Sequence, residues 1–240
     1  MWETQSSVTL IRRGILAAAV MAVAFALIAI ARHAANPTST SDTAVIESFT
    51  LLASRGDLLL GPYSRFQWHH PGPIYFFWMA PFYVLSGART TGLNAAALLL
   101  NLLALTAVGW TLVRRAGGAL GVGITAALAL FLWRTPELLI SPWNPHIPVL
   151  AIVAFLVVAA DAVSGTPAAL PLALVLGSLA GQTHVALLPL TFAVGGALLV
   201  WLVVQIVVVG YSNDPPLQAL YFGLGIVISL VGVSWMRHGG

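Results

Sequence analysis

The stretch GLNAAALLLNLLALTAVGWTLVRRAGGALGVGITAALALFLW, residues 92–133, decides the fold class of this chain. It contains two apolar runs, Gly92–Val113 and Gly118–Trp133, with the charged pair Arg114–Arg115 between them. About 20 apolar residues are enough for a helix that crosses a membrane. The pattern therefore predicts two consecutive membrane-crossing helices.

The composition of the whole chain agrees with this prediction. Of its 240 residues, 59% are hydrophobic and 7% are charged. A soluble domain of this length needs a charged surface to stay in solution, and about a quarter of its residues are usually charged. The composition therefore excludes soluble enzyme folds and predicts an all-α, polytopic membrane protein.

Similar apolar runs extend the prediction to about seven transmembrane helices in one membrane domain, residues 1–240. The further runs are Gly14–Ala31, Ile147–Val163, Ala168–Thr183, Val185–Ile206 and Leu217–Trp235. The first run follows Arg12–Arg13, and we interpret it as an uncleaved first span, with a cleaved signal peptide as the alternative. Residues 92–206 then supply five spans, and residues 217–235 supply the last.

Residues 32–89 form the long loop between the first two spans. A helix is predicted to begin near Asp42 and to stop at Gly56, with an apolar face formed by Val45, Ile46, Phe49, Leu52 and Ala53. Such an amphipathic helix is expected to lie on the outer membrane surface.

The end of this loop is rich in aromatic residues. The segment Pro73–Gly87, PIYFFWMAPFYVLSG, is apolar but short, and it contains two prolines. Aromatic side chains favour the membrane interface, so we predict an interfacial helix, which places residues 32–89 outside. The alternative is that this segment crosses the membrane. The positive-inside rule does not decide between them, because the pair Arg114–Arg115 suits a cytoplasmic loop in the first topology and Arg89 suits one in the second.

The residue types exclude several kinds of chemistry. The ten basic residues other than His are all Arg, and they are scattered, so nucleic acid is not an expected partner. The absence of Lys excludes a Schiff base. The absence of Cys excludes disulfides, thiol catalysis and Cys-ligated metals.

Polar side chains are concentrated at the helix ends that this topology places outside. Transporters commonly carry charged groups or broken helices near the membrane midplane, and such a site is not evident here. A site at the outer membrane surface suits a lipid-linked substrate. The residues concerned are Asp42, Glu47, Asp57, Arg65, His69, His70, Arg89, Arg134, Glu137, Asn144, His146 and His184.

Several of these positions form a recognisable series. Asp42 and Glu47 follow the first span, then come the pair Gly56-Asp57 and the run WHHPGP from Trp68 to Pro73. In this series, residues 12–201 resemble the GT-C class of polyprenyl-phosphate-sugar-dependent glycosyltransferases. The similar branch contains protein O-mannosyltransferases, lipid A aminoarabinose transferases and RgtA/B/C/D-like enzymes.

The resemblance implies a sugar transfer on the outer face of a bacterial inner or plasma membrane, with inversion at the sugar carbon. The implied partners are a polyprenyl-phosphate-linked sugar donor and membrane lipid. Asp42 would be the catalytic base, because an acceptor hydroxyl needs a proton acceptor. The implied substrate-binding residues are Glu47, Arg65, His69, His70, Asn144 and His184, the last within the run GQTH.

One position departs from the family pattern. A second motif, often Asp-Pro in these enzymes, corresponds to Asn144-Pro145 here. Asn lacks the negative charge that helps to hold a divalent metal, so the resemblance implies no certain cofactor and leaves the metal site unassigned.

Other interpretations stay open at this point. Asp42 is also what an N-cap would be, His69 and His70 suit loop hydrogen bonds, and Asn144 suits a turn before proline. Members of the class are longer, so a truncated or inactive member is one alternative. A transporter or permease fragment and a non-catalytic membrane subunit are the others.

Overall fold

The structure is a computed structural model, and it describes residues 41–61, 67–116 and 118–209. Throughout this part of the chain the ordered elements are helices, which confirms the all-α prediction. The predicted spans Gly14–Ala31 and Leu217–Trp235 and the candidate residue Arg65 lie outside the described residues.

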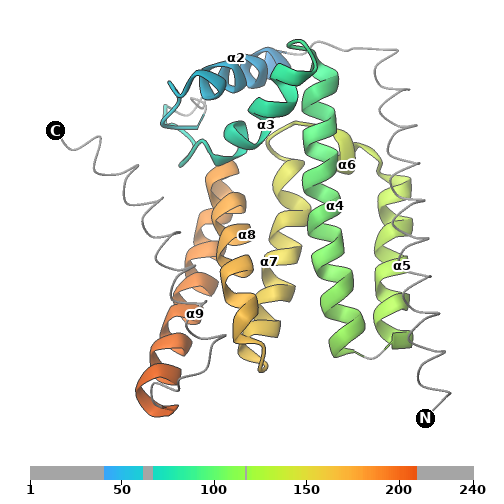
Figure 1. The fold of residues 1–240 in the computed structure, drawn as a ribbon, viewed down its shortest axis with the longest axis vertical. Coiled ribbons are helices and arrows are strands. Elements are labelled where there is room, and N and C mark those ends of the chain that lie inside the picture. Colours follow the sequence, from blue (N-terminus) through green and yellow to red (C-terminus); the bar gives the residue numbers. More distant parts are fainter. Residues whose placement is uncertain (1–40, 62–66, 117, 210–240) are drawn as a thin grey trace.

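Five long helices stand side by side and alternate in direction (Figure 1). They are α4 (Thr90–Arg115), α5 (Gly118–Arg134), α7 (Ile147–Val163), α8 (Leu170–Thr183) and α9 (Leu188–Val209). Because each helix runs opposite to the one before it, the loops fall at two ends of the bundle. The starts of α4, α7 and α9 share one end with the finish of α5 and α8.

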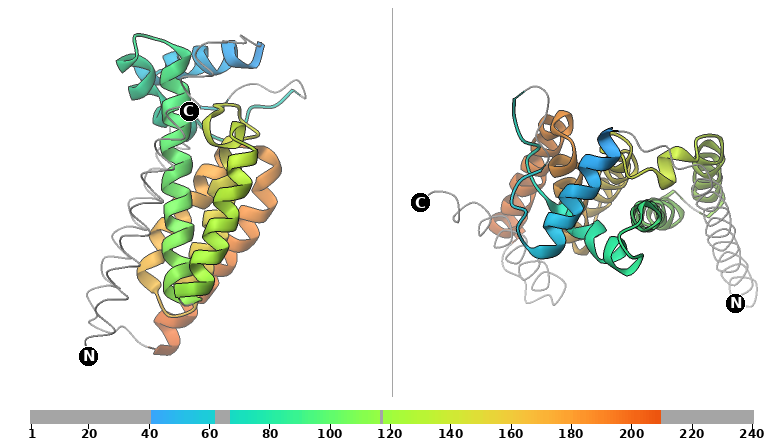
Figure 2. Two further views of the ribbon diagram at one scale, coloured as in Figure 1. Left: turned by 90° about the vertical axis from the view of Figure 1, so that its right-hand side faces the viewer. Right: turned by 90° about the horizontal axis from the view of Figure 1, so that it is seen from above.

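Two helices lie across this end instead of along the bundle (Figure 2). They are α2 (Ser41–Arg55) and α3 (Ile74–Leu85), and the short helix α6 (Glu137–Ile140) lies at the same end. We call this end the capped end. Residues 135–146 and 184–187, which join bundle helices, also lie there.

Local sequence explains where α2 ends and where α7, α8 and α9 begin. Gly56, directly after α2, has a φ angle of +78°, a left-handed conformation that glycine adopts without a steric cost. Proline at the first turn suits α7 and α8, because the first amides of a helix have no partner within it. Single 3-10 turns, Pro167–Ala169 and Val185–Leu187, lead into α8 and α9.

The backbones of α4 and α5 approach each other closely at Gly121. A Cβ atom added at Gly121 would lie 2.5 Å from the Cα of Val113 and 2.6 Å from the carbonyl oxygen of Leu112. At Gly123, two residues further along α5, no atom lies within 4 Å of the added Cβ. Gly121 therefore lets the two backbones approach, and Gly123 does not have this role.

The buried apolar residues form two clusters. One lies among α4, α7, α8 and α9 and includes Phe155 and Leu170. The other joins the cap to the bundle, with Ile46 from α2, Tyr75 and Phe76 from α3, and Leu93 from α4. The cap is therefore an integral part of the fold.

The predicted apolar face of α2 is partly wrong. Ile46, Thr50 and Ala53 are buried, whereas Val45 and Leu52 are exposed. The face turns toward α3, and Phe49 stacks 5.5 Å from Phe76. Helix α3 thus covers the buried part of this face, because its aromatic side chains supply an apolar surface there.

Two of the described helices are long and apolar enough to cross a membrane: Thr90–Arg115 and the segment Val185–Gln205. Only 11% of the apolar window in the second is buried within the protein. The helices α5, α7 and α8 are apolar but shorter. Large apolar side chains such as Trp110, Phe131 and Val200 are exposed along the sides of the bundle.

Candidate functional site

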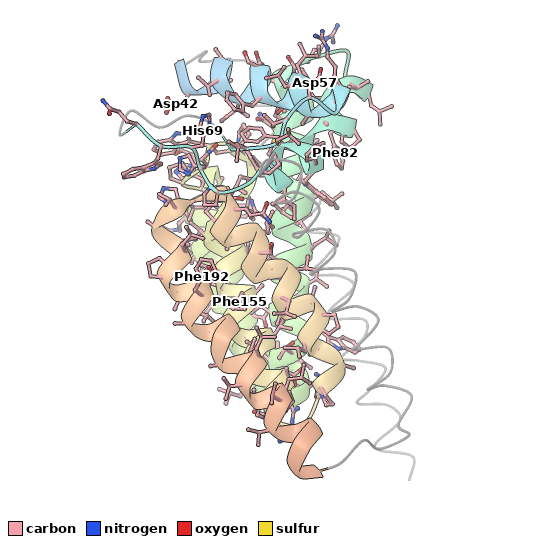
Figure 3. The ribbon with its side chains drawn as sticks, turned by 90° about the vertical axis from the view of Figure 1, so that its left-hand side faces the viewer. Asp42, Asp57, His69, Phe82, Phe155 and Phe192 are labelled. Carbon is pink, nitrogen blue, oxygen red and sulfur yellow. The ribbon has the colours of Figure 1, made fainter. Side chains whose placement is uncertain are left out.

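The capped end carries most of the predicted site residues. Figure 3 shows Asp42 at the start of α2, Asp57 beyond its other end and His69 between α2 and the bundle. Glu47 lies on α2, Asn144 precedes α7, and His184 follows α8. The described candidates therefore share one end, although they come from three separate parts of the sequence.

Asp42 is held by a residue far away in the sequence. The indole Nε1–H of Trp143 donates a hydrogen bond of 2.8 Å to Oδ2 of Asp42. The helix begins at Ser41, so Asp42 lies in its first turn and its carboxylate contacts the loop before α7. The structure thus gives Asp42 a tertiary contact that an N-cap role does not require.

The loop that supplies Trp143 is itself fixed in place. The buried hydroxyl of Tyr75 donates to the carbonyl oxygen of Pro142, the residue before Trp143. The ring of His146 lies 4.9 Å from the Trp143 ring in an edge-on arrangement. Asn101 of α4 donates through Nδ2 to the carbonyls of Leu138 and Leu139, 3.0 Å away in each case, which secures α6 at the start of this loop.

Asn144 lies in the turn between Trp143 and α7. The amide of His146 donates to the carbonyl of Trp143, which closes this turn. The backbone of Asn144 therefore fits the turn interpretation. Asn144 also directly follows Trp143, the residue that holds Asp42.

Glu47, on α2, interacts with residues of α3 and α4. The hydroxyl of Thr90, at the start of α4, donates a 2.7 Å hydrogen bond to its Oε1. Burial, and then the charge of Glu47, raise the pKa of the Tyr83 hydroxyl on α3. Glu47 thus joins α2 to the α3–α4 corner.

The loop after α2 is closed by backbone pairing near the two histidines. The amide of Gly61 donates to the carbonyl of His70, and the Nδ1 atom of His69 lies 2.9 Å from the carbonyl of Gly61. A Cβ atom at Gly61 would lie 2.6 Å from the Cβ of His70. This close approach requires glycine at position 61.

His70 and His184 form a pair at the end of α8. Their ring centroids are 5.7 Å apart, with an angle of 54° between the planes. Burial lowers the pKa of His70 because it disfavours a charged ring, and the nearby His184 lowers it further because it disfavours a second positive charge. His70 is therefore mainly neutral at pH 7, and its ring offers an N–H donor rather than a positive charge.

Gln182, near the end of α8, packs against the loop at Gly72. A Cβ atom added at Gly72 would lie 2.1 Å from its Oε1, so the loop presses its backbone against the end of α8. The Nδ1 atoms of His70 and His146 are buried and have no hydrogen-bond partner within the described protein. Such atoms are costly to bury and are candidates for a partner that arrives with a ligand.

The His, Asp and Glu side chains are dispersed in the described part of the chain. No group of three or more His, Asp or Glu side chains there is arranged to hold a metal ion. The pair of His70 and His184 on its own is too small for a closed zinc site, which uses four ligands.

Sequence reasoning missed two features. The first is Trp143, because a Trp before Asn-Pro suggests from sequence only an interfacial residue. The second is Asp161 at the opposite end, whose buried carboxylate accepts hydrogen bonds from Arg114 and Arg115. A carboxylate inside the apolar run Ile147–Val163, together with an Arg pair at the end of another run, was the signal for this cluster.

The Asp161 cluster joins three segments. Arg115 also donates through Nη2 to the hydroxyl of Thr166, 2.6 Å away, and to the carbonyl of Asp161. The cluster ties the end of α4 to the end of α7 and to the loop before α8.

Comparison with known proteins supplies no relative: no protein-family model, curated protein or solved structure matches this chain.

Proposed function

We propose that this protein is a multi-pass membrane glycosyltransferase of the GT-C type. It moves a sugar from a polyprenyl-phosphate donor to an acceptor hydroxyl at the outer membrane surface, with inversion at the sugar carbon. The capped end is the active face, and the described part of the 32–89 loop, residues 41–61 and 67–89, lies outside the cytoplasm.

The distribution of apolar and polar groups supports a multi-pass arrangement. Large apolar side chains are exposed along α4, α5 and α9, where a soluble protein would expose charges. The alternating bundle helices bring their polar connections to two ends. Arg114 and Arg115 lie at the end opposite the cap, which suits a cytoplasmic end under the positive-inside rule.

One observation carries the proposal: a carboxylate at the capped end is oriented by an aromatic side chain from a distant loop, and a pair of histidines lies at the same end. Asp42 has a defined orientation through Trp143, and His70 and His184 offer N–H donors at the same end. A base and anion-binding donors are what displacement of a phosphate from a sugar requires.

The reaction follows from these groups. The acceptor hydroxyl gives its proton to Asp42 as its oxygen attacks C1 of the sugar. The bond between C1 and the phosphate oxygen breaks, and the polyprenyl phosphate leaves with the electron pair. His69, His70 and His184 donate hydrogen bonds to this phosphate, and the aromatic face of α3 guides the prenyl chain. A single displacement inverts C1.

The test is sugar transfer by the purified protein in lipid nanodiscs. A panel of polyprenyl-phosphate-linked radiolabelled sugars is supplied together with lipid, glycan and protein hydroxyl acceptors. Asp42→Asn should lower the transfer rate by about 10²–10⁴-fold, since it removes a general base while its volume is kept. Labelled product should appear with the inverted anomeric configuration.

Glu137→Gln is the matched control, because Glu137 is an exposed carboxylate at the same end, on α6. It should transfer sugar at the wild-type rate. If Asp42→Asn is as active as Glu137→Gln, Asp42 is not the base. If the wild type transfers no sugar from any donor, the glycosyltransferase proposal is wrong.

A further inference from the structure

We infer that Trp143 is the positioning residue for Asp42, and that it acts through its indole N–H rather than through its ring. The inference rests on the proposed function, since it assigns the residue that orients the base of that reaction.

The first argument is the direction of the hydrogen bond. Trp Nε1–H can only donate, and the carboxylate Oδ2 of Asp42 accepts this bond at 2.8 Å. A carboxylate on the first turn of an exposed helix would otherwise rotate between several rotamers. With Oδ2 fixed, Oδ1 takes a defined direction, and it is the oxygen that would accept the acceptor's proton.

The second argument is that the donor is held by more than its own backbone. The buried Tyr75 hydroxyl fixes the carbonyl of Pro142, and the buried Asn101 amide fixes α6. The His146 ring lies edge-on to the indole. Catalytic groups need support from side chains that are themselves fixed, and this loop provides it.

The third argument is that the bond joins distant parts of the chain. Asp42 and Trp143 are separated by 101 residues, so neither helix α2 nor the loop before α7 produces this contact by local geometry. Trp143 remains 42% exposed, so the bond is not needed to bury the ring. An exposed indole that is aimed at a carboxylate is better explained by orientation of that carboxylate than by packing.

The first measurement detects the contact without any reaction. In a ¹H–¹⁵N spectrum of the protein in nanodiscs, each of the eight tryptophans gives an indole signal. The signal that Trp143→Phe removes belongs to Trp143. In Asp42→Ala this signal should move upfield, while the signal of Trp110, which lies on α4 and is assigned by Trp110→Phe, should stay in place. A Trp143 signal that does not move overturns the inference.

The second measurement is kinetic. Trp143→Phe keeps an aromatic ring beside His146 but removes the N–H donor, so kcat should fall about 10- to 100-fold, the value of one hydrogen bond to a charged group. The KM for the donor should change little, because the phosphate site lies on other residues. Trp110→Phe is the matched control and should keep wild-type kcat.

A double-mutant cycle distinguishes action through Asp42 from a general structural effect. In an Asp42→Asn background, Trp143→Phe should cause no further loss of kcat. An additional 10-fold loss, or a normal kcat in Trp143→Phe alone, overturns the inference and leaves the proposed function intact. Absence of transfer by the wild type overturns the proposed function, whatever the indole signal shows.

Discussion

His70 occupies a place where its protonation is unfavourable, and this makes stability depend on pH. Burial and His184 lower its pKa below the usual value of about 6.5. As the pH falls from about 6.5 to the lowered pKa, the unfolded chain binds more protons than the folded one, so the free energy of unfolding decreases. We expect the midpoint of thermal unfolding in detergent to fall over this window more steeply in the wild type than in His70→Gln.

His184→Gln tests the causes separately. It removes the neighbouring charge but leaves the burial of His70, so its pH slope should lie between those of the wild type and His70→Gln. Equal slopes in all three proteins would show that His70 is not the group that titrates.

The candidate site residues could be predicted in kind but not in their contacts. Polar residues at helix ends within an apolar chain identify Asp42, His70 and His184 as surface groups. Their neighbours depend on packing across the bundle, which periodicity does not reveal. For this reason Trp143 was missed, and for Glu47 the sequence did not indicate its hydrogen bond with Thr90.

At the scale of elements, the prediction of helices from apolar runs was most accurate in the bundle. The run Ile147–Val163 coincides with α7, and Gly118–Trp133 differs from α5 by one residue. The predicted start of α9 at Val185 is early because residues 185–187 form a 3-10 turn. Helix α6 was not predicted, because its four residues are too few to show a period.

The contact between α4 and α5 gives a test of element packing. Gly121→Ala places a methyl group against the backbone of α4, and overpacking of this kind should lower stability by about 1–3 kcal/mol. Gly123→Ala has open space around the added carbon, so it should be neutral or slightly stabilising. Thermal unfolding of the two variants in the same detergent measures the difference, and equal midpoints would show that the close approach is absent.

The Asp161 cluster gives a second test, because its members are buried unequally. The Asp161 side chain is 1% exposed, whereas Arg114 and Arg115 are 42% and 37% exposed. Removing both cations leaves a buried charge without a partner, which should cost about 3–5 kcal/mol. Asp161→Asn leaves two cations that water or lipid phosphates can reach, so its cost should be smaller.

The order of these effects is the critical result. The double variant that carries both Arg114→Gln and Arg115→Gln should unfold at the lowest temperature. Adding Asp161→Asn to this double variant should partly restore its stability. If Asp161→Asn alone is the least stable protein, the loss of stability in these variants does not come from a buried carboxylate left without a partner.

At the scale of the whole molecule, the proposed topology places the cap outside and the Asp161 cluster inside. The chain contains no Cys, so single cysteines can report the side of the membrane. Cysteines at Ala88 and Ala186, at the capped end, should react with a membrane-impermeant maleimide in intact cells. Cysteines at Ala116 and Ser164, at the other end, should react only after the membrane is opened.

The outcome at Ala88 is decisive for α3. If Ala88 is labelled only from inside, Pro73–Gly87 crosses the membrane and the capped end is not a single outer face. If all four positions label alike, the bundle does not cross the membrane in the proposed way.

The hydrogen bond between Asp42 and Trp143 also has a consequence for biogenesis. The ribosome makes the 101-residue interval between them in about 5–20 s, at about 5–20 residues per second. In the proposed topology, the first outer segment therefore leaves the translocon long before its partner loop does. During that time Asp42 has no indole to hold it, and α8, which carries His184 at its end, follows later still. Under the proposed function, the capped end is therefore complete only after α7 and α8 are inserted, and a nascent chain that lacks them cannot transfer sugar at the membrane surface.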